Sequence, residues 1–235
     1  YRPVEVSEHV VQAIHDNGSN ISCVATATGL VFFDTGLSTA AARQFRKDME
    51  TRFEHPTRAL VLTHAHLDHL FGMAAFDDVP VYAASAGRRR WEQLVGLEWN
   101  EQVVAHFAAI FPTLTGEVDD ARLRLPTVWF DDELELGDDD GPLLIRRYGG
   151  HSADSSAALV SGDGVVISGD LVQARRHPYF GEPDTDFDAW VGALKDWDER
   201  GVKAIAPGHG PPIDADELRA VRLWFAETVA AVAEM

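Results

Sequence analysis

Residues 64–69 read His-Ala-His-Leu-Asp-His, which places three imidazoles and one carboxylate within six positions. Imidazole and carboxylate are the ligands that borderline divalent metals such as zinc prefer. The apolar residues 59–62 directly upstream read as a buried strand, and the helix-breaking Gly72 follows shortly after. The sequence therefore predicts a metal-binding turn at the end of a buried strand.

The spacing within this hexamer divides its ligands. His64 and His66 are two positions apart, so on extended backbone both side chains point to the same side and can share one metal. Asp68 and His69 are adjacent and point elsewhere, unless the turn directs them toward a second metal. The alternative is a chance cluster of surface histidines, which is uncommon in a chain with 10 histidines among 235 residues.

The composition limits the partners of this chain. It is 46% hydrophobic and 25% charged, as in a globular protein with an apolar core, and its formal net charge is −18. Two divalent ions would leave it strongly acidic, and such a field repels phosphate backbones. The dense basic clusters are Arg88-Arg89-Arg90 and Arg175-Arg176. We therefore expect a small-molecule substrate rather than a nucleic acid, and the sequence does not indicate the oligomeric state.

Neither a membrane span nor a signal peptide is recognisable in the chain. It contains no apolar run of 18 residues, and its single cysteine, Cys23, lies in a β-type run where we expect a small buried hydrophobe. A cytoplasmic location and no membrane partner are the expectations. The chain begins at Tyr1 rather than Met, so a segment upstream of it could be missing.

Strands and helices alternate in two halves. In the first, residues 10–14, 20–27, 30–34, 59–62 and 79–82 predict strands, and Ser38 is expected to cap a helix that runs to about Phe53. In the second, residues 128–130, 133–136, 143–148, 156–160, 165–168 and 203–206 predict strands, and residues 187–199 and 215–234 predict helices. This order favours an α+β fold with two packed sheets and helices outside, in a single domain spanning residues 1–235.

Residues 84–114 are predicted to form a helical insertion that is longer than a simple connection needs. Trp91, Trp99, Phe107 and Phe111 recur at roughly helical spacing. That spacing indicates core packing first, and a lid over a hydrophobic substrate is the alternative. The acidic run at residues 138–141 adjoins a proline and is interpreted as a solvated turn.

Three further candidate ligands stand just past predicted strands. His151, Asp170 and His209 each lie beside or near glycine, where the backbone can approach a metal closely. Any one of them alone is more often a turn residue than a ligand. Three in this order after the hexamer are hard to interpret as turns.

With this ordered set, the chain resembles the metallo-β-lactamase superfamily of metallohydrolases, from the Phe33-Asp34-Thr35-Gly36 stretch to His209. The subfamily is not identified. The resemblance implies an αββα sandwich of two mixed β-sheets with a dinuclear site at one edge. It also implies a set of roles: His64, His66 and His151 for the first metal, Asp68, His69 and His209 for the second, Asp170 bridging both, and Asp34 ordering the ligand loop behind them.

One stretch departs from the family pattern. Relatives often have Pro-Gly-His-Thr-x-Gly-Ser around the third histidine, whereas here Gly149 replaces the proline and Asp154 replaces a glycine. Ser152 and Ser155 fit the pattern. The departure leaves the local turn around His151 open.

The predicted chemistry is hydrolysis by a hydroxide bound to two divalent ions, because each ion lowers the pKa of bound water. Zinc suits the ligand types, and manganese or iron could occupy the same set. Asp68 is the expected catalytic residue, orienting the nucleophile or accepting its proton. We expect cleavage of an ester, lactone, lactam or thioester. The alternatives are a phosphodiesterase or nuclease, a mononuclear iron sulfur dioxygenase, and a non-enzymatic metal-stabilised scaffold.

The loop after Asp170 is the candidate substrate loop. Arg175 or Arg176 could anchor an anion, and Tyr179 with Phe180 could form an aromatic wall. A surface loop with solvated arginines is the favoured alternative. Lactone-opening relatives often carry a tyrosine shortly after the bridging aspartate, so here Tyr179 would have to fold back.

Overall fold

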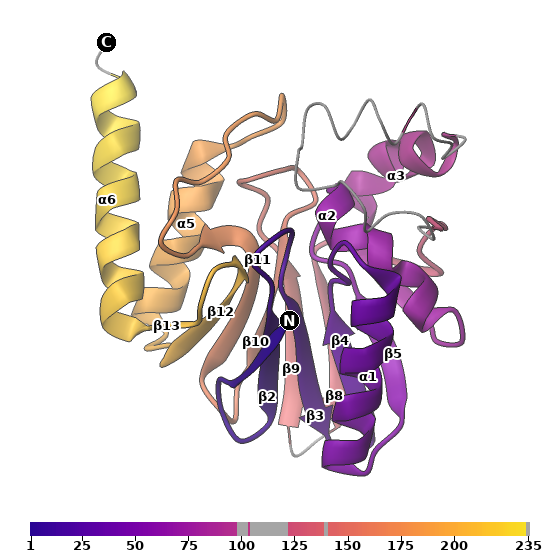
Figure 1. Ribbon diagram of the computed structural model, residues 1–235. Helices are drawn as coiled ribbons and strands as arrows, with labels where there is room; N and C mark the ends of the chain where they lie inside the picture. The colour runs from indigo at the N-terminus through magenta and orange to yellow at the C-terminus, as the bar shows by residue number, and fades with distance from the viewer. Residues whose placement is uncertain (98–102, 104–121, 139–140, 234–235) are drawn as a thin grey trace.

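Two β-sheets packed face to face, with helices on both outer faces, form the fold in the computed structural model (Figure 1). The structure describes residues 1–97, 103, 122–138 and 141–233. The helices on one side are α1 (Thr39–Phe53), α2 (Leu67–Leu70), the 3-10 turns η1 (Phe71–Phe76) and η2 (Ser85–Gly87), and α3 (Arg88–Val95); those on the other are α5 (Phe187–Glu199) and α6 (Ala215–Ala233). Among these residues, no helix is both long enough and apolar enough to cross a membrane.

The first sheet has seven strands whose spatial order follows the chain. β1 to β4 pair antiparallel and β4 to β7 pair parallel, so β4, β5 and β6 end at the same edge. The strands are β1 (Arg2–Glu5), β2 (Val10–Ile14), β3 (Ile21–Thr26), β4 (Gly29–Phe33), β5 (Thr57–Val61), β6 (Val81–Ala84) and β7 (Val128–Phe130).

The second sheet has six strands in the order β13-β12-β11-β10-β9-β8. Its pairs are antiparallel except β11 with β12, which are parallel and therefore also end at one edge. The strands are β8 (Glu133–Asp138), β9 (Gly141–Arg147), β10 (Ser156–Val160), β11 (Val165–Gln173), β12 (Ala204–His209) and β13 (Ile213–Asp214).

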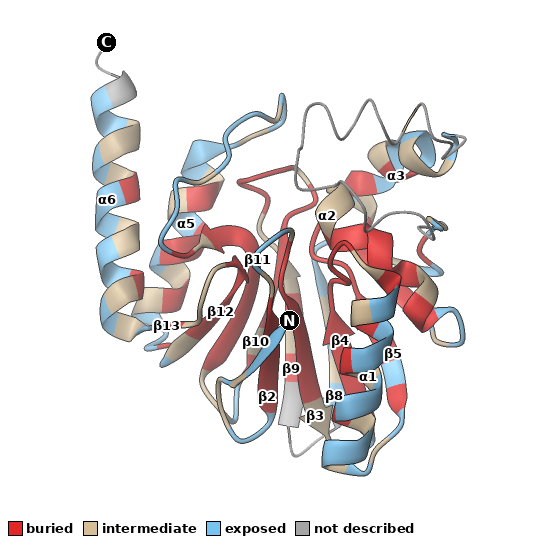
Figure 2. Ribbon diagram, viewed as in Figure 1, coloured by how far each residue is buried: buried red, intermediate tan, exposed pale blue. Residues whose placement is uncertain are grey.

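Side-chain alternation along the strands produces three apolar layers. Figure 2 shows that the buried residues gather in the strands of both sheets, while the helices outside them carry exposed residues. In β4, Val31 and Phe33 face the layer between the sheets, whereas Leu30 and Phe32 face the layer under α1. The layer outside the second sheet contains Trp190 and other residues of α5 and α6. Cys23 is buried, as its β-type surroundings predict. The predicted two-sheet arrangement is therefore confirmed.

Most predicted elements occur within a few residues of their expected bounds. Ser38 caps α1 by accepting a hydrogen bond from the Ala41 amide at 3.2 Å. The strand expected at residues 79–82 lies at Val81–Ala84 instead: Pro80 has no amide hydrogen to donate, and only its carbonyl oxygen bonds to β5, accepting from the Leu60 amide at 3.0 Å.

The prediction that helix begins at residue 84 is wrong for the first residues of the 84–114 segment. β6 continues through Ala84, a 3-10 turn follows, and α3 covers only Arg88–Val95. Trp91 is fully buried in the layer under the first sheet, as the core interpretation predicts. Trp99, Phe107 and Phe111 lie outside the described residues, as do Asp139 and Asp140, so the lid remains a prediction.

Gly72 lets the turn that follows the hexamer pack against the loop after β4. It is buried, and a Cβ atom there would collide with the carbonyl oxygen of Thr35 and lie 3.0 Å from the Ala42 Cβ. In the same loop, the Gly36 carbonyl oxygen accepts a hydrogen bond from the Gly72 amide at 3.2 Å. This close backbone approach holds η1 against the loop after β4.

Replacing Gly72 by alanine is expected to destabilise the protein by about 1–3 kcal/mol, because the obstructing atom is backbone and must move. Gly192→Ala is the matched control: Gly192 is exposed within α5 and its Cβ would meet nothing within 4 Å. The control should be neutral or stabilise by about 0.5–1 kcal/mol. Denaturant unfolding monitored by circular dichroism measures both, and equal effects would contradict the packing role of Gly72.

Candidate metal centre

Side chains from both sheets meet at the edge where the parallel strands end. His64 and His66 follow β5, and Asp68 and His69 lie on α2. From the second sheet come His151, after β9, Asp170 in β11 and His209 at the end of β12. The fold thus brings together all seven residues expected as ligands, in two groups that could each hold a metal ion.

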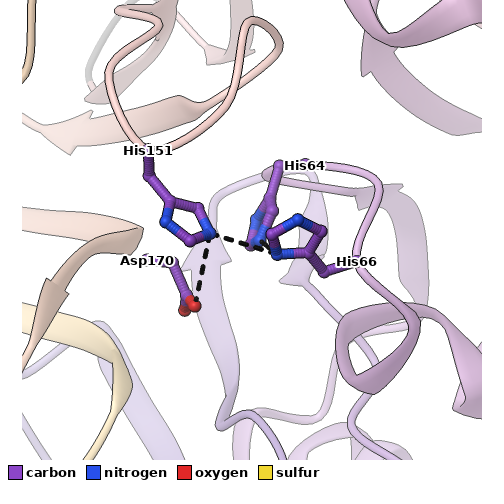
Figure 3. Close-up of side chains that lie close together, drawn as sticks. All are labelled: His64, His66, His151 and Asp170. Carbon is purple, nitrogen blue, oxygen red and sulfur yellow. Dashed lines mark hydrogen bonds and ion pairs between the residues drawn. The ribbon is translucent and has the colours of Figure 1, made fainter. Parts of the chain in front are cut away.

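The first group contains His64, His66 and His151, with Asp170 as its fourth member (Figure 3). His66 Nδ1 lies 2.9 Å from His64 Nε2 and 3.1 Å from His151 Nε2. Donors around a tetrahedral zinc ion with bonds of about 2.0 Å lie about 3.3 Å apart. Three imidazole nitrogens at this spacing suit one ion.

The second group consists of Asp68, His69 and His209. His209 Nε2 lies 3.2 Å from Asp68 Oδ2, and His69 Nε2 lies 3.9 Å from the same oxygen. The short helix α2 redirects Asp68 and His69 away from the first group. Two imidazoles and a carboxylate are again a suitable donor set for a divalent ion.

Asp170 stands between the two groups. Its Oδ1 lies 3.2 Å from His69 Nε2 and 3.3 Å from His209 Nε2, and its Oδ2 lies 3.7 Å from His151 Nε2. His69 Nε2 and Asp170 Oδ1 are both buried and have no hydrogen-bond partner among the described residues. Buried polar atoms normally have a hydrogen-bond partner. A cation bound between these two atoms would take the place of the partner that each lacks.

Asp34 holds the ligand loop from behind. Its carboxylate accepts hydrogen bonds from the Thr63 amide at 2.8 Å and from His69 Nδ1 at 2.7 Å, and the Thr63 hydroxyl contacts His64 Nδ1 at 3.0 Å. These contacts leave His69 Nε2 and His64 Nε2 facing the metal groups. Asp34 adopts the left-handed conformation, with φ of 59°, which is uncommon for a residue with a side chain.

Burial and neighbouring charges set the ionisation of the ligands. Burial lowers the pKa of His64 well below its ordinary value and that of His151 to about 4, so both imidazoles are neutral at pH 7. Although burial opposes it, His69 and His209 hold the pKa of Asp68 at about 2. The carboxylates in turn outweigh burial and raise the pKa of His209 to about 9. Loading the second group with a metal would therefore release protons from its imidazoles.

Asp154, which departs from the family pattern, ties two ligand loops together. The Ala65 amide donates to Asp154 Oδ2 at 2.9 Å, and the Ser152 hydroxyl donates to Asp154 Oδ1 at 2.8 Å. Burial raises the pKa of Asp154. Gly87 in η2 leaves room for its carboxylate, since a Cβ atom there would overlap it.

A cavity of about 430 Å³ opens beside the metal groups. Of the candidate substrate loop, Arg176 and Tyr179 line it, and Tyr179 folds back so that its carbonyl oxygen lies 3.1 Å from His151 Nδ1. Arg175 does not line it: its guanidinium pairs with Glu217 at 3.2 Å on an exposed surface. The other lining residues are Asp16, Gly18, Ala65, His66, Leu67, Asp68, Arg90, Leu94, Asp170, Gln173, Glu182 and His209.

Sequence reasoning missed Arg90, Gln173 and Glu182. Gln173 Nε2 donates to Asp170 Oδ2 at 3.2 Å, and Glu182 Oε1 lies 2.9 Å from His66 Nε2. No pattern in the sequence distinguishes Glu182 from a solvated acid or Arg90 from its two neighbouring arginines. The one available signal is proximity of Gln173 and Glu182 to Asp170 along the chain.

Asp34→Ala is expected to weaken metal binding 10- to 100-fold, because His69 loses the partner that orients it. Competition with a chromogenic chelator measures the affinity. Asp163→Ala is the control: Asp163 likewise accepts hydrogen bonds, from Ser7 and His9, but belongs to neither metal group. Unchanged affinity in Asp34→Ala would contradict the role assigned to Asp34.

Comparisons with known proteins agree with this geometry. A family model described as the metallo-beta-lactamase superfamily matches residues 16–209. The 2,4-dinitroanisole O-demethylase subunit alpha of Nocardioides sp. (strain JS1661) is 24% identical over 214 residues. The match covers 87% of this chain and 57% of that relative, so the chain spans little more than half of the relative's length.

Solved structures share the fold at low sequence identity. A metallo-beta-lactamase from Pontibacter korlensis superposes with a TM-score of 0.68 and 22% identity, covering 96% of this chain and 98% of that one. A double mutant of the sec-alkyl sulfatase PisA1 superposes with a TM-score of 0.72 and 18% identity, covering 95% of this chain and 40% of that one. TMB-1 superposes with a TM-score of 0.69 and 15% identity, covering 97% of this chain and 98% of that one.

Proposed function

The chain belongs to the metallo-β-lactamase superfamily, and we propose that it is a hydrolase that uses two divalent ions, zinc by ligand type, to cleave an ester-type bond of a small molecule. The observation that carries this proposal is the position of Asp170, whose two carboxylate oxygens face different ligand groups. Ions held there would lower the pKa of a water molecule between them and supply a hydroxide nucleophile.

The ligand residues differ in their access to substrate. The His64, His69 and His151 side chains have almost no exposed surface, whereas the Asp68 side chain is 28% exposed and lines the cavity. Asp68 is therefore the carboxylate best placed to orient the nucleophile or hold its proton. Gln173, which donates to Asp170, helps keep that carboxylate in place.

The cavity walls favour a small substrate with one anionic group. Ala65, Leu67 and Leu94 supply apolar surface. Arg90 is neutralised by Glu182 and Asp184, whereas Arg176 forms no ion pair with any carboxylate that the structure describes. We propose that Arg176 binds the anionic group of an ester, lactone, lactam or thioester.

The names of two similar proteins add further types of bond to the substrates that should be tested. An O-demethylase acting on 2,4-dinitroanisole and a sec-alkyl sulfatase point to aryl ethers and sulfate esters beside the carbonyl substrates. A phosphodiesterase or nuclease uses similar chemistry, but the net charge of −18 opposes binding of a phosphate backbone. The complete second group makes a mononuclear iron dioxygenase the weaker proposal, and a scaffold without turnover is weaker still.

Chelation is expected to abolish hydrolysis of a responsive ester, lactone or thioester, and adding back zinc should restore it. Elemental analysis should find two ions per chain in the active protein, since two ligand groups are present. Manganese and iron added to the same apoprotein identify the metal that supports the highest rate. Turnover that persists in protein shown to be free of metal would contradict the proposed chemistry.

Arg176→Ala is expected to lower kcat/KM by about tenfold for an ester that carries a carboxylate, because a charge-assisted hydrogen bond contributes roughly 1.5 kcal/mol. A neutral ester of the same size should respond less than twofold. Arg175→Ala is the matched control, since its side chain pairs with Glu217 outside the cavity. Equal losses for both substrates would show that Arg176 does not bind an anion.

A further inference from the structure

One nitrogen of His66 faces the ligand group and the other faces a carboxylate outside it. Nδ1 lies toward His64 and His151, as Figure 3 shows for the three rings. Nε2 lies 2.9 Å from Glu182 Oε1. A neutral imidazole carries one proton, so a metal can bind Nδ1 only when that proton is on Nε2. Glu182, a pure acceptor, favours this tautomer.

Arg90 presents the opposite preference at the same nitrogen. Its Nη2 binds Glu182 Oε2 at 2.6 Å and Asp184 Oδ1 at 3.1 Å, while its Nη1 lies only 3.3 Å from His66 Nε2. A guanidinium can only donate, so it favours an imidazole whose Nε2 lacks a proton. That tautomer carries its proton on Nδ1 and cannot bind a metal there.

We propose that Glu182 is a positioning residue that selects the metal-binding tautomer of His66 against the opposing influence of Arg90. This inference rests on the metal centre of the proposed function. Glu182 lies on the loop between β11 and α5, and Arg90 lies on α3, so the pair joins the outer sides of the two sheets across the cavity.

The same loop orients a second ligand of the first group. The Tyr179 carbonyl oxygen accepts from His151 Nδ1 at 3.1 Å, which directs His151 Nε2 toward His66. Glu182 and Tyr179 are three residues apart. Partners that orient ligating histidines typically affect metal affinity 10- to 100-fold, so this loop determines how tightly the first ion is held.

The test compares single and double variants by metal affinity. Glu182→Ala should weaken binding of one of two zinc ions 10- to 100-fold in competition with a chromogenic chelator. Glu182→Ala combined with Arg90→Ala should recover part of that affinity, because the group favouring the wrong tautomer is then absent. A purely structural role for this ion pair would instead give the double variant no better affinity than Glu182→Ala, because the single variant has already lost the contact.

Asp184→Ala is the matched control. Asp184 binds the same guanidinium, and also the Ala153 amide at 3.2 Å, but does not touch His66. Metal affinity in this variant should stay within about twofold of the parent. Cobalt substituted into the first group should show an altered visible spectrum in Glu182→Ala and an unaltered one in Asp184→Ala.

Two results would overturn the inference. One is parental zinc affinity and cobalt spectrum in Glu182→Ala; the other is a double variant that binds zinc no more tightly than Glu182→Ala alone. Both are distinct from failure of the proposed function, in which the unsubstituted protein itself would bind no metal at His64, His66 and His151.

Discussion

The apolar layer between the two sheets decides whether a metal centre exists, because neither sheet carries a complete ligand set. The first sheet supplies His64, His66, Asp68 and His69, and the second supplies the other three. The positions of Val31 and Phe33 against Ile167 and Ala206 in this layer therefore set the separation of the ligands. A dry layer of this kind is densely packed and transmits a shift rather than absorbing it.

Buried hydrogen bonds between the sheets fix their relative position near the ligands. The Asn20 side chain donates to the Pro207 carbonyl oxygen at 3.0 Å and to that of Gly210 at 2.8 Å, on both sides of His209. Gln12 donates to the same Pro207 oxygen at 2.9 Å. The Ser156 amide donates to the Thr63 carbonyl oxygen at 2.9 Å, next to His64. These directional contacts add to the apolar packing and hold the two sheets in one register near the candidate ligands.

The sequence was sufficient to predict which seven candidate ligands the fold brings together, and the strands that they follow, but not the residues that surround them. Histidine and aspartate at predicted strand ends are visible in one dimension, because parallel strands end at one edge whatever the loops do. The contact of Glu182 with His66 depends on how the loop after β11 folds back, and no local pattern encodes that path. The helical pattern of Trp91 and Leu94 likewise gave no sign that Ser85–Gly87 would form a separate turn before α3.

Under the proposed function, some of the residues that line the substrate cavity also contact the candidate metal ligands. Arg90 and Leu94 project from α3 and Tyr179 and Glu182 from the opposite loop, and all four line the cavity. Two of them reach the first ligand group, Glu182 through its carboxylate and Tyr179 through its carbonyl oxygen. A substitution at Glu182 that reshapes the cavity would therefore also change metal affinity. Divergence of substrate range in such a chain is physically easier through the exposed Arg176, which lines the cavity without an ion pair to a described carboxylate, than through Glu182, which also contacts His66.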